Sequence, residues 1–318
     1  AAYGGDLVVN LGGDRRKLVL GENGFAPQRL RLQDDEATGV LYWDNPVDVT
    51  NRPLTVQVAN VVSDKRVVWR GAVTSSATED SGAFTKIGNG RLVLADGADF
   101  GPIAFTANNT VELDVTNRQE LACNMSGNNL WLEKYGPGVT ILSGSNTYIN
   151  ATRIYEGALY VNGTNSLGGT FTIHAEAMLG GVGMVAPKGG ATVTVNGALT
   201  PGAAPGECGT LTLGSPAQST TLHLNGALQV EISLENHDCA AVLGNVTFGD
   251  GATIAVTAQD ETVWLARRGE EMPLLTWSGT KSGTWSLATP LPSGWKIREK
   301  ADGLYAGYAP TGTLISVQ

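Results

Sequence analysis

The segment Leu132-Glu-Lys-Tyr-Gly-Pro-Gly-Val-Thr-Ile-Leu142 joins a glycine-rich corner to a short β-prone run. The same order of residue types occurs earlier, in Phe84-Thr-Lys-Ile-Gly-Asn-Gly-Arg-Leu-Val-Leu94, and Lys134 follows Lys86 by 48 residues. Paired glycines suit a tight corner with positive φ, after which the alternation of a strand resumes. With roughly 20 to 25 residues in each turn of a coil, we expect this offset to be two turns.

Outward from these segments, the tripeptide Gly-Ala-Leu recurs at residues 157–159, 197–199 and 226–228. The runs Ala191-Thr-Val-Thr-Val195 and Gly209-Thr-Leu-Thr-Leu213 alternate with a period of two. We expect Thr to face outward and Val or Leu to fill the interior. A β-sandwich does not require such imperfect repeats, whereas a coil that buries each turn against its neighbours does. The sequence therefore predicts an all-β, right-handed parallel β-helix with capped ends.

The composition agrees with an all-β chain. There are 42 Gly, 42% of residues are hydrophobic and only 16% are charged, and no apolar period of 3.6 residues is sustained. The ends differ from the middle, as capped coils do. We expect an N-terminal β cap with irregular turns at 1–75, a repeat-containing β-solenoid at 76–235, and C-terminal β turns or a small β module at 236–318.

Charge and cysteine content exclude several classes of function. The net charge is −9, and the compact basic cluster is confined to Arg15-Arg-Lys17, so an acidic surface disfavours nucleic acid as a partner. No apolar run approaches the roughly 18 to 20 residues that a membrane-spanning helix needs. Cys208 and Cys239 are candidates for one disulfide, but with Cys123 the three are favoured as small buried residues.

Several segments resemble the autotransporter-associated β-strand repeat. They are Glu133–Tyr148 with its Lys-x-Gly-x-Gly corner and Ser-Gly-Ser-Asn-Thr-Tyr end, Glu156-Gly-Ala-Leu-Tyr-Val161, Leu179-Gly-Gly-Val-Gly183, and Pro273-Leu-Leu-Thr-Trp-Ser-Gly-Thr280. The resemblance is good from about 84 to 295. It implies a secreted or cell-surface β-helix, extracellular or on the outer surface of a Gram-negative-type bacterium. We expect a passenger segment or a freestanding secreted relative.

The sharpest catalytic candidate is Asp80 in Asp80-Ser-Gly-Ala83. This order matches the core motif of aspartic proteases, in which two carboxylates share a proton and activate water. The sequence has one copy only, preceded by Thr78-Glu79 where apolar strand residues are expected. Because Asp-Ser-Gly is also an ordinary turn, a turn is favoured over catalysis, and enzyme activity stays uncertain.

Other candidate sites are weaker. His237-Asp-Cys239 collects nucleophilic residue types, but strand neighbours point to opposite faces, and no metal-ligand spacing occurs. We therefore expect no metal and no cofactor. Tryptophan rings stack well on sugars, and Trp285 and Trp295, beside Gly and Pro, are the rings favoured for exposure and ligand binding, although core or cap packing is the simpler explanation.

These observations lead to three hypotheses about function. The first is a secreted or cell-surface β-solenoid with a structural, adhesive or host-glycoprotein-binding role, whose partner is a host or surface glycoprotein or glycan. The alternative is a secreted hydrolase of the aspartic-protease type that uses Asp80 on protein or glycoprotein. The third is a polysaccharide-cleaving β-helix enzyme, which needs two carboxylates across a groove.

Overall fold

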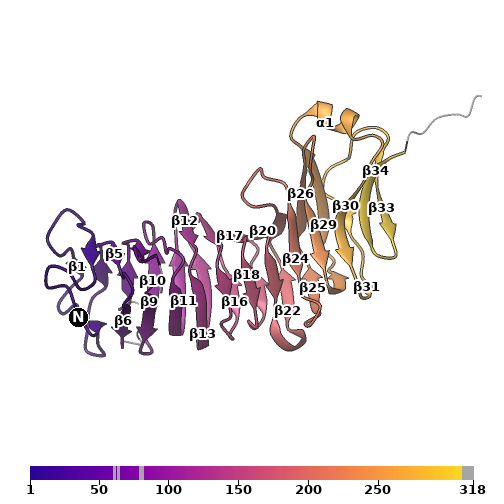
Figure 1. Cartoon of the computed structure of the whole chain (residues 1–318). Helices are drawn as coiled ribbons and strands as arrows, with labels where there is room; N and C mark the ends of the chain where they lie inside the picture. Colours follow the sequence, from indigo (N-terminus) through magenta and orange to yellow (C-terminus); the bar gives the residue numbers. More distant parts are fainter. Residues whose placement is uncertain (60–61, 63–64, 79–81, 310–318) are drawn as a thin grey trace, which may run out of the picture.

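The computed structural model describes residues 1–59, 62, 65–78 and 82–309. Over these residues the chain winds into an elongated coil of parallel strands (Figure 1). The N-terminus lies at one end, and α1 (Glu261–Ala266), β33 (Trp295–Lys300) and β34 (Gly303–Tyr308) lie at the other. The predicted right-handed parallel β-helix is confirmed. Asp80, the protease candidate, lies outside the described residues, so its role stays a prediction.

Sheet 1 extends along the whole coil. Its main path joins the following strands: β1 (Leu7–Val9), β4 (Leu41–Trp43), β7 (Val67–Trp69), β10 (Leu92–Ala95), β11 (Ala104–Asp114), β13 (Asn124–Tyr135), β16 (Thr152–Ile154), β19 (Phe171–Ile173), β22 (Thr192–Val195), β25 (Thr220–Leu224), β28 (Gly244–Phe248) and β31 (Lys281–Ser282). Three more strands join it through β11: β3 (Leu30–Gln33), β6 (Pro53–Val58) and β9 (Ala83–Ile87). The division of the chain at 75 and 235 stays a prediction.

Sheet 2 forms the second face of the coil. Its strands are β12 (Arg118–Leu121), β14 (Val139–Leu142), β17 (Gly157–Val161), β20 (Ala177–Gly181), β23 (Ala198–Pro201), β26 (Ala227–Ile232), β29 (Thr253–Ala258) and β32 (Ser286–Leu287). A short sheet of β2 (Leu18–Val19), β5 (Val47–Asp48) and β8 (Val73–Thr74) leads toward it. Phe100 connects the two, because it bridges Val73 on one side and Leu121 on the other.

Sheet 3 forms the third face and ends in the C-terminal cap. Its strands are β15 (Ser145–Asn146), β18 (Thr164–Ser166), β21 (Met184–Ala186), β24 (Thr210–Leu213), β27 (Cys239–Val242), β30 (Glu271–Trp277), β34 (Gly303–Tyr308) and β33 (Trp295–Lys300). The last two pairings are antiparallel. The helix α1 (Glu261–Ala266), whose N-cap Asp260 accepts from the Thr262 N–H, lies beside this cap, and a 3-10 turn occupies Lys188–Gly190.

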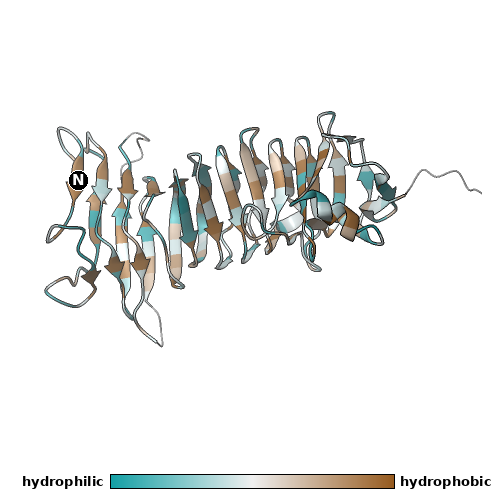
Figure 2. Ribbon diagram, turned by 90° about the horizontal axis from the view of Figure 1, so that it is seen from above, coloured by the Kyte–Doolittle hydropathy of each residue, from teal (hydrophilic) through white to brown (hydrophobic). Residues whose placement is uncertain are grey.

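Alternation along the strands produces the core, as Figure 2 shows by the change of hydropathy from residue to residue. The predicted Gly-Ala-Leu repeats stack in register on sheet 2, where Leu159, Leu179, Leu199, Leu228 and Ile254 form one buried column. In the two Thr-rich runs the Val and Leu residues are buried and the Thr residues are not, as expected. Each turn thus covers the apolar side chains of the next.

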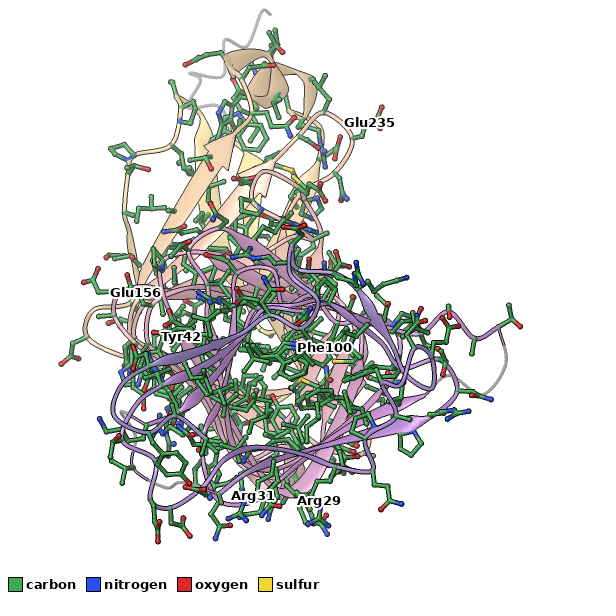
Figure 3. All side chains as sticks on the ribbon, turned by 90° about the vertical axis from the view of Figure 1, so that its left-hand side faces the viewer. Arg29, Arg31, Tyr42, Phe100, Glu156 and Glu235 are labelled. Atoms are coloured by element: carbon green, nitrogen blue, oxygen red, sulfur yellow. The ribbon has the colours of Figure 1, made fainter. Side chains whose placement is uncertain are left out.

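Aromatic rings fill the N-terminal part of the core. Trp43 and Trp69 are stacked with ring centroids 5.0 Å apart, and Phe84 packs against Trp69, Phe100 and Phe105 at 5.2–5.3 Å. Viewed along the axis in Figure 3, Phe100 lies inside the coil, whereas Arg29, Arg31 and Glu156 lie at its surface. Trp43 and Trp69 are both buried, so their rings belong to the core.

The 48-residue offset is not two turns of the coil. Lys134 pairs in register with Leu113, and Leu113 pairs with Leu94, so Leu94 precedes Lys134 by two turns. Lys86 instead pairs with Ala107 in the other half of β11. The two copies of the motif therefore lie at two different corners of the coil, because the position two turns before Lys134 is Leu94 and not Lys86.

Candidate functional site

A cavity of about 340 Å³ lies on the outer face of sheet 2, where segment 201–206 comes close to the strands. Tyr160 pairs in register with Gly180, and Gly180 pairs with Thr200, so these residues share one outward column. Asn162 donates from Nδ2 to the carbonyl oxygen of Ala203 at 2.9 Å and fastens the loop over the sheet. The full lining is Tyr160, Met178, Thr200, Pro201, Ala204, Pro205, Gly206, Gln229, Glu231, Asp238, Ala255 and Thr257.

Asp238 is the most constrained polar group of this cavity. Its residue is 1% exposed, and its two carboxylate oxygens accept from the backbone N–H groups of Gly209 and Glu231, both at 2.8 Å. Burial raises the pKa of the carboxyl to about 7, although both N–H donors favour the ionised form. Both oxygens are therefore engaged, and Glu231 is the half-buried carboxylate left to meet a ligand.

The raised pKa of Asp238 predicts how the free energy of unfolding changes with pH. Its pKa is higher in the folded state than the ordinary 3.8, so the folded chain binds more protons between about pH 4 and 7, and this group's contribution to stability falls as pH rises through that window. Because the folded chain loses its extra proton in this range, we expect the unfolding free energy of the wild type, relative to Asp238→Asn, to fall by on the order of 2 kcal/mol between about pH 5 and 8, a value that allows for solvent screening. Urea unfolding at both pH values measures it.

The exposed Asp250 provides the matched control for this pH prediction. The difference between wild type and Asp250→Asn should stay constant over the same range within about 0.5 kcal/mol. A wild-type stability that rises with pH relative to Asp238→Asn would contradict the raised pKa of the buried carboxyl.

A second hollow, of about 510 Å³, adjoins the cavity and shares Met178 with it. Its lining residues are Tyr135, Pro137, Tyr155, Glu156, Gly157, Glu176 and Met178. Beside it, the rings of Tyr135, Tyr155 and His174 stack along the coil, with centroids 4.6 and 4.5 Å apart. Because the ring faces cover one another, ring edges and polar groups are what this stack offers to a ligand.

We call the cavity and the adjoining hollow together the sheet-2 groove. Its lining combines apolar surface with the carboxylates of Glu156, Glu176, Glu231 and Asp238, and among the described residues that line it there is no Lys, Arg or His. No group of His, Cys, Asp and Glu suited to hold a metal ion occurs within the described ranges. The groove can bind a ligand that is apolar on one side and carries donors or positive charge on the other.

The two predicted tryptophans lie away from this groove, in the C-terminal cap. Trp295 is 6% exposed, and its ring packs against Trp264 and Tyr308, with centroids 4.9 and 6.0 Å away. Of the two explanations offered for Trp295, cap packing is the one found and exposure is not, because the cap encloses the ring. Trp285 is half-buried against the core and donates from Nε1 to Glu299 at 3.0 Å. Its ligand-binding role stays a prediction.

The cysteine and histidine candidates do not form a nucleophilic site. Cys123, Cys208 and Cys239 are free thiols, and burial raises the pKa of Cys239 to about 11, which disfavours the reactive thiolate. His237 faces Arg267 at 3.4 Å. Sequence reasoning grouped Asp238 with these residues and missed its partner Glu231, although Glu231 alternates with the buried Val230 and Ile232.

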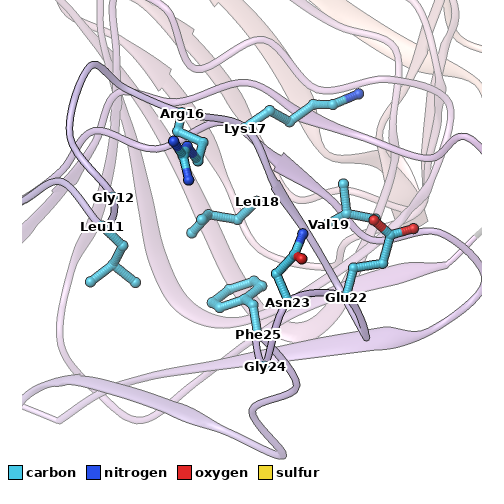
Figure 4. Close-up of a pocket in the computed structure, with 10 residues that line it drawn as sticks. All are labelled: Leu11, Gly12, Arg16, Lys17, Leu18, Val19, Glu22, Asn23, Gly24 and Phe25. Carbon is cyan, nitrogen blue, oxygen red and sulfur yellow. The ribbon is translucent and has the colours of Figure 1, made fainter.

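Another hollow, of about 330 Å³, lies at the N-terminal end and is lined by residues between Leu11 and Phe25 (Figure 4). Its lining comes from one continuous stretch of the chain, which includes β2, rather than from the strands of several turns. Beside it, Arg15 and Lys17 approach Asp44 and Asp48 at 3.6 and 3.5 Å. These two members of the basic cluster are thus paired within the chain.

The fold and the groove define the class of protein: a right-handed parallel β-helix with an acidic, partly apolar groove along one sheet. No family model matches the chain. Over 68 residues the sequence is 40% identical to the Adhesin BmaC autotransporter of Brucella suis biovar 1 (strain 1330). This stretch is 21% of the chain and 2% of that adhesin. Within the described residues, no helix has the length and apolar character needed to cross a bilayer.

Proposed function

We propose that the chain is part of a cell-surface adhesin of a Gram-negative-type bacterium and that its β-helix binds a host or surface glycoprotein or glycan. The observation that carries the proposal is the 40% identity to an autotransporter adhesin. The coiled fold supports it, because a long stack of turns presents an extended surface to a partner. The sheet-2 groove is a concave part of that surface with convergent polar groups.

The test is adherence of beads that carry the purified chain to surfaces coated with a glycoprotein, before and after enzymatic removal of its glycans. We expect deglycosylation to reduce bead retention at least fivefold. Retention no greater than that of uncoated beads would contradict the adhesive role. Retention that deglycosylation does not change would point to a protein ligand instead of a glycan.

Asp80→Asn separates this proposal from the protease hypothesis. An adhesin should bind equally well with this substitution. If the wild type cleaves an unfolded protein at acidic pH and Asp80→Asn abolishes the cleavage, the aspartic-protease hypothesis replaces ours, because that chemistry needs the carboxylate.

A further inference from the structure

Acidic side chains on the outer face of sheet 1 are paired with arginines, whereas those that line the sheet-2 groove have no basic side chain beside them in the lining. On the outer face of sheet 1, Arg91 lies between Glu112 and Glu133 at 3.2 and 3.1 Å, and Arg66 and Arg153 add further ion pairs. In the sheet-2 groove, the lining holds four carboxylates and no basic side chain. A concave surface with one sign of charge and low-dielectric walls concentrates counter-charge.

At the cavity end of the groove, two neighbouring carboxyl groups favour the binding of a cation. Asp238 is 1% exposed, and a buried carboxylate without a counter-charge is unfavourable even when it accepts hydrogen bonds. Glu231 lines the same cavity and donates its own backbone N–H to Asp238. The charge of Glu231 opposes ionisation of Asp238, and an ammonium group paired with Glu231 relieves that repulsion.

The rest of the cavity suits a ring with hydroxyl groups. Thr200, Gln229 and Thr257 offer side-chain donors and acceptors, while Met178 and Pro205 supply apolar surface. A volume of about 340 Å³ is at the lower end of the range for small-ligand sites. A lysine side chain would use the carboxylates but leave these hydroxyl and amide groups without partners.

We infer that the sheet-2 groove binds an amino sugar with a free amino group, held by Glu231 through its ammonium and by Thr200 and Gln229 through its hydroxyls. This inference rests on the proposed glycan-binding function and names the sugar class. Asp238 acts as a positioning residue, because its two oxygens accept from the backbone N–H groups of Gly209 and Glu231 and fix the backbone that carries Glu231. The adjoining hollow, with Glu156 and Glu176, takes the next sugar of the chain.

The test is isothermal titration of the full chain with a β-linked glucosamine disaccharide and with its N-acetylated counterpart, near pH 6 and about 0.1 M salt, where distant charges are screened. We expect the amino form to bind at least tenfold more tightly. Glu231→Gln should weaken it at least tenfold, since a charge-assisted hydrogen bond is lost. Glu207→Gln, the same change on the exposed side of the covering loop, should leave the dissociation constant unchanged.

Several outcomes overturn the inference. Equal binding of the amino and N-acetylated disaccharides to the wild type would overturn it. Equal losses of affinity in Glu231→Gln and Glu207→Gln would also overturn it, because they indicate unspecific electrostatic attraction. Binding of a lysine-rich peptide in place of the disaccharide would assign the groove to a protein ligand. If beads adhere through glycans but the amino disaccharide does not bind, this inference fails while the proposed function stands.

Discussion

Gly163→Ala is expected to destabilise the coil by about 3 kcal/mol, the upper end of the usual cost of overpacking, because the added methyl group meets rigid backbone. A Cβ atom at residue 163 would lie 2.1 Å from the carbonyl oxygen of Gly144, and one at Gly144 or Gly183 would lie equally close to the preceding turn. That oxygen accepts from the Thr164 N–H at 3.1 Å. The turns cannot separate to admit the methyl group without losing this bond and its neighbours.

Urea unfolding followed by circular dichroism measures the effect of Gly163→Ala. Gly269→Ala is the matched control, since a Cβ there meets nothing within 4 Å. Its free energy of unfolding should differ from that of the wild type by no more than about 0.5 kcal/mol. Similar losses of stability in both variants would show that contact with the Gly144 carbonyl oxygen is not what excludes a larger residue at position 163.

Much of the fold follows from local pattern. The strands at 192–195 and 210–213 have the predicted faces because period-two alternation fixes which side chains are buried, whatever the length of the loops between them. The Gly-Ala-Leu tripeptides stack in register because each begins a strand of the same sheet. The offset between Lys86 and Lys134 misled because the same corner motif occurs at two different corners of the coil, so its spacing is not a whole number of turns.

The sequence alone could not predict the sheet-2 groove, because local patterns do not give the register between turns. Tyr160, Thr200 and Glu231 come from three strands separated by loops of unequal length, and their convergence depends on the register of every turn between them. Alternation marks each as outward-facing but does not say which outward residues meet. The position of Asp238 beneath the loop end depends on contacts with Gly209 that no local motif encodes.

Lys134→Met is expected to destabilise the chain by about 3 kcal/mol or more. The lysine is 0% exposed, and its Nζ donates to the carbonyl oxygens of Tyr135 and Gly136, both at 2.7 Å, and of Glu156 at 3.4 Å. Each buried acceptor that loses its donor costs about 1–3 kcal/mol. Burial lowers the pKa of Lys134 to about 8, so the ammonium carries a desolvation cost that offsets part of this loss.

The lysine of the Lys-x-Gly-x-Gly corner stabilises the fold only if its hydrogen bonds to the carbonyl oxygens outweigh the cost of desolvating its ammonium group. Lys86 repeats the arrangement at another corner, where its Nζ donates to Gly88 O at 3.0 Å and to Asn108 O, so Lys86→Met should show a similar loss. The exposed Lys188 is the control, and Lys188→Met should change the urea midpoint very little. If Lys134→Met unfolds at the wild-type midpoint or above it, the desolvation cost outweighs the carbonyl contacts. The lysines would then not stabilise their corners, and the glycines alone would account for the recurrence of the motif.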